Sequence, residues 1–82
     1  MSKFFAEAEE ELNRARATYP AFHSAHEGES VLREEFDELV AWVRRKPRNR
    51  DRAEMRRECV QIAAMAARFA IELCDTGKVN AL

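Results

Sequence analysis

Three carboxylates close together in one apolar segment are the residues of this chain best placed to bind a metal ion. Glu34, Glu35 and Glu38 lie within an apolar-periodic run, residues 31–43. Side chains three or four positions apart share one face of a helix, so Glu38 can meet a cation together with either of the other two. Hard divalent ions prefer such oxygens, with water and substrate phosphates as further ligands. The same residues would also suit the solvated edge of an amphipathic helix.

Glu58 favours the metal-binding interpretation, because it lies in a second apolar run, residues 54–73. A helical projection places its side chain among three apolar residues, Ile62, Met65 and Phe69. A bare carboxylate in such surroundings is costly to ionise, so it needs a metal ion, a basic partner or a shared proton. An arginine from a neighbouring chain is the main alternative to a metal ion. Gln61, one turn further on, offers a neutral oxygen at the edge of the same face.

Three helices must position these side chains. Apolar periodicity predicts them over residues 3–18, 24–46 and 52–76, followed by a tail, residues 77–82. The second helix has two candidate starts, Ser24 as a cap or a point nearer Glu29, because a glycine lies between them. The third helix is apolar on nearly all sides, more than two helices of this size can cover. We therefore expect a single all-α domain, residues 1–82, in which three helices per chain form a bundle completed by oligomerisation.

Composition and charge exclude several classes of function. Charged residues make up 35% of the chain and the net charge is −1, so a basic stretch, residues 44–57, is balanced elsewhere and nucleic acid is not an expected partner. No apolar run reaches the roughly 18 residues of a membrane span, and the N-terminal segment does not resemble a signal peptide. Cys59 and Cys74 fall about 22 Å apart along one helix, so they are expected to be free thiols packed in the core. These features predict a cytoplasmic protein.

The acidic motif resembles that of a known enzyme superfamily. Glu34-Glu35-x-x-Glu38 followed by Glu58-x-x-Gln61 is similar to the Glu-x-x-Glu and Glu-x-x-Asp signature of the MazG-like, all-α NTP pyrophosphohydrolases. The surrounding runs, residues 30–39 and 56–68, are also similar, the second to a small-protein branch of the superfamily. The resemblance covers about residues 23 to 76. Gln61 is the departure, since the signature has an aspartate there.

The resemblance implies a Mg²⁺-dependent enzyme, with Mn²⁺ as a substitute, that splits a nucleoside triphosphate into the monophosphate and pyrophosphate. By position it implies Glu35, Glu38, Glu58 and Gln61 as the metal site, and Glu34 as a ligand or as the residue that orients the attacking water. Members form dimers or tetramers, which agrees with the apolar third helix. A neutral Gln61 weakens the expected metal site. The alternative is therefore a non-catalytic helical oligomer with a degenerate site.

Four further residues are candidates for binding the substrate. Arg57 and Arg68 on the third helix would hold phosphates. Trp42, beside the acidic edge of the second helix, would stack on a base, although core or interface packing explains it equally well. His23 would line the pocket from the first connector, in preference to forming a transition-metal pair with His26.

Overall fold

Residues 2–76 are described by the structure, a computed structural model, and over these residues the chain is helical with short connectors. Helix α1 spans Lys3–Thr18 and α2 spans Ala25–Val43. A 3-10 turn, η1 (Pro47–Asn49), leads into α3 (Arg52–Phe69), which continues as a π-helical turn, η2 (Ala70–Cys74). The expected all-α fold with three main helices is confirmed. The predicted tail, residues 77–82, lies outside the described residues.

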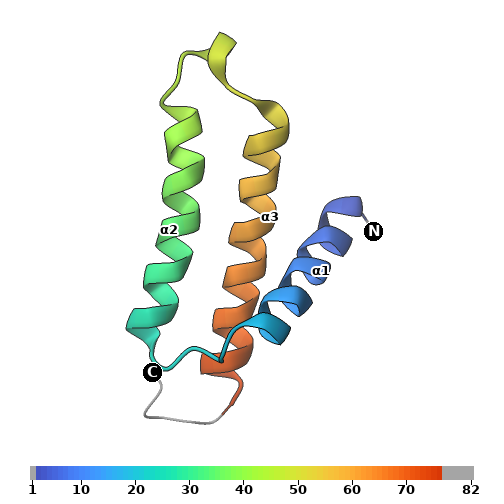
Figure 1. The fold of residues 1–82 in the computed structure, drawn as a ribbon, viewed down its shortest axis with the longest axis vertical. Coiled ribbons are helices and arrows are strands. Elements are labelled where there is room, and N and C mark those ends of the chain that lie inside the picture. The colour runs from blue at the N-terminus through green and yellow to red at the C-terminus, as the bar shows by residue number, and fades with distance from the viewer. Residues whose placement is uncertain (1, 77–82) are drawn as a thin grey trace.

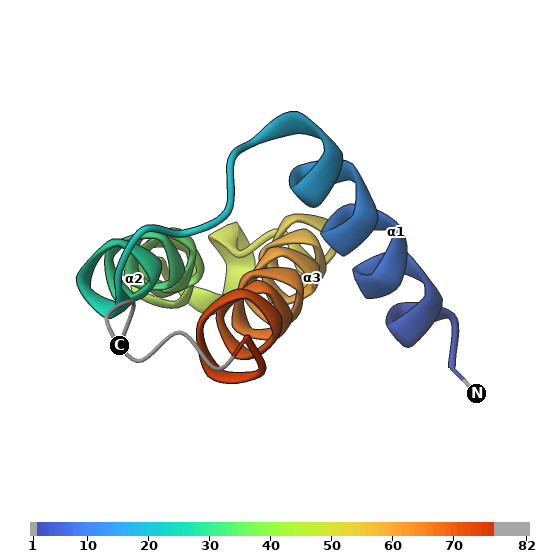
Figure 2. The ribbon, with the colours of Figure 1, turned by 90° about the horizontal axis from the view of Figure 1, so that it is seen from below.

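The central element is α3. It lies antiparallel beside α2, and α1 crosses it obliquely on another side (Figures 1 and 2). The core forms where α1 meets α3, around Ala15, Ala64 and Met65, with three partly buried residues packed against it, Leu12, Val31 and Leu32. Small alanines let the helix axes approach closely, and Ala15 and Ala64 are almost fully buried. Because α3 packs against both other helices, its side chains reach every part of the site described below.

Two helix ends differ from the sequence prediction. Helix α2 ends at Val43, not at residue 46, because the Arg50 side chain folds back and donates hydrogen bonds to the Val43 and Arg45 carbonyl oxygens. The last turn of the third helix is π-helical instead of α-helical. The start of α2 is settled by Ser24, whose hydroxyl accepts a hydrogen bond from the Glu27 amide at 3.2 Å.

Parts of the apolar surface stay uncovered in the single chain. Phe36 and Val43 on α2 are 53% and 48% exposed, and Ala66 on α3 and Ala70 on η2 are also exposed. Both cysteines are free, but Cys74 is exposed, so the prediction that it packs in the core is wrong. Over the described residues, no helix is both long enough and apolar enough to cross a membrane.

Gly28 allows α2 to approach α3 closely. A Cβ atom at this buried position would lie 2.7 Å from Cδ2 of Phe69 and 3.0 Å from Cδ1 of Leu73. The first distance is shorter than real Cβ contacts and the second is at the tight limit, so the ring or the helix would have to move. The glycine that complicated the sequence prediction is therefore explained by packing.

We expect Gly28→Ala to destabilise the protein by about 1–3 kcal/mol, the usual cost of overpacking. In an unobstructed helix the same change is stabilising by about 1 kcal/mol, so the sign of the effect is informative. Urea unfolding gives the measurement, with Ser30→Ala on the exposed side of the same helix as a control expected to change stability by less than about 0.5 kcal/mol. A more stable Gly28→Ala variant would show that the contact with Phe69 does not constrain the packing.

Candidate metal centre

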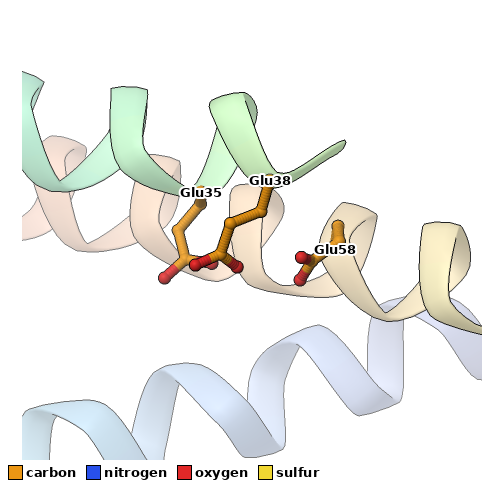
Figure 3. Close-up of side chains that lie close together, drawn as sticks. All are labelled: Glu35, Glu38 and Glu58. Carbon is orange, nitrogen blue, oxygen red and sulfur yellow. The ribbon is translucent and has the colours of Figure 1, made fainter. Parts of the chain in front are cut away.

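Glu35, Glu38 and Glu58 come together where α2 packs on α3. One carboxylate oxygen from each lies within 4.8 Å of the others. Figure 3 shows Glu35 and Glu38 extending from adjacent turns of α2 toward Glu58 on α3. The spacing of three positions on α2 aligns the first two, and the antiparallel packing of α3 brings the third alongside. The structure thus assembles the three carboxylates that sequence reasoning put forward as metal ligands.

Mutual repulsion perturbs the protonation of this cluster. Burial, reinforced by a hydrogen bond with Glu38 and by the charges of nearby carboxylates, raises the pKa of Glu58 to about 7. Burial and the neighbouring charges of Glu38, Glu34 and Glu11 also raise the pKa of Glu35. Like charges this close disfavour full ionisation, so at neutral pH the Glu58 carboxyl holds a proton for much of the time.

The donor set fits a hard divalent cation. Among residues 2–76, no lysine or arginine forms a salt bridge with Glu35, Glu38 or Glu58. Opposite ligands of one Mg²⁺ or Ca²⁺ ion lie about 4–5 Å apart, which is comparable with the spacing of these oxygens. Within the described residues the cluster therefore has no protein cation that would neutralise it, and its oxygens are close enough to share an ion.

We call the cluster of Glu35, Glu38 and Glu58 the carboxylate centre. A pocket of about 410 Å³ opens beside it. It is lined by residues of all three helices and by residues 19–23 of the α1–α2 connector. Glu35 belongs to both the pocket and the carboxylate centre. The volume is within the range of small-molecule sites, about 300–1,000 Å³. A ligand in the pocket would therefore lie next to a metal ion held by the three carboxylates.

The other predicted site residues are divided between this pocket and the surface. Glu34, His23 and Arg68 line the pocket. Trp42 does not line it; the guanidinium of Arg45 lies 4.1 Å from the centroid of its ring. Arg57 is exposed, pairs with Glu54 and lines a different surface depression. Neither Trp42 nor Arg57 is among the residues that line the pocket.

Gln61 faces α1 as well as the pocket. Its side chain hydrogen-bonds Glu11, and together with the Arg14 guanidinium this bond lowers the pKa of Glu11. A carboxylate from the first helix therefore stands next to the position where the resembling signature has an aspartate. Sequence reasoning missed Glu11, because nothing in the pattern showed which face of residues 3–18 would meet the third helix.

Glu72 is the second residue that sequence reasoning missed. Its carboxylate is buried between Arg68 and Arg16 and accepts the Phe22 amide hydrogen at 2.9 Å. The guanidinium of Arg68 lies over the Phe22 ring, 4.0 Å from the centroid, and its Nη2 donates to the Pro20 carbonyl oxygen at 3.0 Å. The available signal was an Arg–Glu pair four positions apart within an apolar helix, since charges in that setting need partners.

Comparisons with models of protein families, with curated proteins and with solved structures found no match to this chain. The functional argument therefore depends on the residues and geometry of the chain itself.

The raised pKa of Glu58 predicts an unusual pH dependence of stability in the absence of divalent ions. Its ordinary pKa is about 4.5 and its folded value about 7, so the folded state binds more protons between these values. The stabilisation is complete below about pH 4.5 and is lost as the pH rises through about 7. In EDTA we expect the free energy of unfolding to be larger at pH 5.5 than at pH 8.

Urea unfolding at the two pH values measures this difference, and Glu58→Gln supplies the control. The amide carries no charge at either pH, so this variant should show a flatter pH dependence than the parent. A parent protein whose stability rises between pH 5.5 and 8, or changes as Glu58→Gln does, would contradict the repulsion described here.

Proposed function

We propose that this protein is a Mg²⁺-dependent nucleoside triphosphate pyrophosphohydrolase, which releases the monophosphate and pyrophosphate. The observation that carries the proposal is the convergence of Glu35, Glu38 and Glu58 at the edge of a ligand-sized pocket, with no salt bridge to a basic residue in the described part of the chain. The resemblance of Glu34-Glu35-x-x-Glu38 and Glu58-x-x-Gln61 to the MazG-like signature supports the same reaction. The comparison with solved structures found no match and therefore adds no support to this proposal.

Each acidic residue has a proposed role. Glu35, Glu38 and Glu58 hold Mg²⁺, or Mn²⁺ in its place, and the bound ion would neutralise charge on phosphate oxygens and lower the pKa of a water molecule. Glu34 is exposed at the pocket wall and outside the carboxylate centre, so we assign it the orientation of the attacking water. Gln61 adds a neutral oxygen beside Glu11. A bound ion would displace the proton from Glu58.

The pocket walls support an organic phosphate as the ligand. His23 lies in the wall formed by the connector, where its imidazole can donate a hydrogen bond to a phosphate or a base. Arg14, which is exposed and paired with Glu11, also lines the pocket and can contact a phosphate. Arg68 lines the pocket too, but its guanidinium is paired with Glu72. Phosphate contacts by Arg57, and base stacking by Trp42, stay predictions, because neither residue lines this pocket.

Assembly into a dimer or tetramer is the second part of the proposal. A groove of about 360 Å³ runs between α2 and α3, with Leu32, Phe36, Ile62 and Ala66 among its lining residues. Phe36 is half exposed there, and a single chain of this size buries only about 60% of its unfolded surface. A second copy packed on this face would complete the bundle and leave the pocket, which opens toward α1, accessible.

We expect the purified protein to release pyrophosphate from at least one canonical ribo- or deoxyribonucleoside triphosphate when Mg²⁺ is present, and to stop when EDTA is added. Glu38→Gln removes one anionic ligand and should reduce the rate at least about a hundredfold. Glu9→Gln is the matched control, because Glu9 is an exposed helical carboxylate outside every site described above. Sedimentation of the same preparation should give a dimer or tetramer.

The outcome separates this proposal from its alternative. Pyrophosphate release at background level with every nucleotide, and no difference between Glu38→Gln and the parent, would leave a non-catalytic helical oligomer with a degenerate site. Gln61, hydrogen-bonded to Glu11 where the signature has a free carboxylate, is the feature that favours this alternative. A monomer at micromolar concentration would reject the assembly but not the reaction.

A further inference from the structure

A buried ion pair fastens the α1–α2 connector to the end of α3. Arg68 and Glu72 are 4% and 7% exposed. Oε1 of Glu72 accepts a hydrogen bond from the Phe22 amide at 2.9 Å, and Oε2 lies 3.3 Å from Nε of Arg16. The carboxylate thus contacts the connector, the end of α1 and, through Arg68, its own helix.

The Arg68 guanidinium is almost fully engaged in the same network. Its Nη2 lies 3.3 Å from Oε1 of Glu72 and 3.0 Å from the Pro20 carbonyl oxygen, and its Nε lies 3.4 Å from Oε2 of Glu72. One face of the guanidinium covers the Phe22 ring. Among the described residues, Nη1 reaches only the sulfur of Met65, at 3.9 Å. A planar, bidentate group held in this way is well suited to fixing a backbone segment.

The fastened segment is also one wall of the pocket. Residues 19–23 are five consecutive lining residues, and they have no regular secondary structure of their own. Three of them, Tyr19, Pro20 and Phe22, present rings or apolar surface, and Val31 and Met65 extend this surface. This wall of the pocket is therefore suited to an uncharged ring, and Glu27, whose carboxylate accepts the His23 amide hydrogen, is the acidic lining residue bonded to it.

We propose that Arg68 and Glu72 are positioning residues that hold the connector as the wall for the organic part of the substrate, and so set the affinity for nucleotide. This inference rests on the proposed function, since it concerns the same pocket. Arg68 would thus act on nucleotide binding indirectly, through its contacts with Pro20 and Phe22. The carboxylate centre is a separate group of residues. Loss of the pair should weaken nucleotide binding without weakening metal binding.

The test uses Glu72→Gln, which keeps the shape of the side chain and removes its charge, and Arg68→Lys, which keeps the charge and loses the two-sided hydrogen bonding. For the nucleotide with the highest hydrolysis rate, we expect KM to rise about tenfold and kcat to stay within about twofold in each variant. The Kd of the corresponding nucleoside monophosphate, measured by titration calorimetry, should rise by a similar factor. The thermal shift produced by Mn²⁺ alone should not change.

Glu29→Gln is the matched control, because Glu29 and Arg33 form an Arg–Glu pair with the same spacing on the exposed face of α2. Hydrogen exchange at the Phe22 amide gives a readout that does not depend on nucleotide. It should be slow in the parent and faster in both variants. Rapid exchange in the parent would show that the contact with Glu72 is not formed, and would overturn the inference even if both variants fail to fold.

The remaining outcomes separate this inference from the proposed function. Unchanged KM and Kd in folded variants would overturn the positioning role while leaving the hydrolase proposal intact. Absence of hydrolysis in the parent, with monophosphate binding weakened by Glu72→Gln, would reject the hydrolase and support the positioning of a nucleotide-binding wall. Absence of binding by every canonical nucleoside mono- and triphosphate would overturn both.

Discussion

Repulsion among three carboxylates at the contact between α2 and α3 is the constraint around which this small fold is arranged. Glu58 lies beside Glu35 and Glu38 at the junction between two helices, and burial and like charge raise its pKa to about 7. A helix pair selected for stability alone would have an apolar or oppositely charged residue there. A cation or a proton on Glu58 would relieve this repulsion, and the proposed cation would explain why all three residues are acids.

The remaining structure supports this junction from both sides. On one side, Gly28 lets α2 approach Phe69 and Leu73, which fixes the distance between the helices that carry the carboxylates. On the other side, the buried Arg68–Glu72 pair fastens the connector and closes the pocket next to Glu35. In this way α3 contributes Glu58 to the carboxylate centre, and the Arg68–Glu72 ion pair joins the end of α3 to η2. The two acids differ, because Glu72 is paired with arginines, whereas Glu58 has no salt bridge within residues 2–76.

The sequence was sufficient for the helices and for the carboxylate centre, because both depend on local periodicity. Spacing along one helix places Glu35 and Glu38 together. The apolar neighbours of Glu58 on the helical projection predict that its side chain lies at a packing surface. The sequence did not indicate Glu11 or Glu72, since their roles depend on how α1 crosses α3, and a single chain has no local signal for that angle. The end of helix α2 was not predictable for a similar reason. The Arg50 side chain, seven positions away, donates a hydrogen bond to the Val43 carbonyl oxygen. Trp42 and Arg57 were assigned from the faces that they occupy on a helical projection, and neither lines the pocket in the structure.

Direct titration of the protein with Mn²⁺ tests the central claim that Glu35, Glu38 and Glu58 form a divalent-metal site. Calorimetry at pH 7.5 without nucleotide should give saturable binding of one ion per chain, with affinity reduced at least about tenfold in Glu58→Gln. Glu54→Gln, a carboxylate one turn away on the same helix and outside the carboxylate centre, should bind nearly as the parent does. Absence of saturable binding, or equal affinity in Glu58→Gln and the parent, would contradict this account.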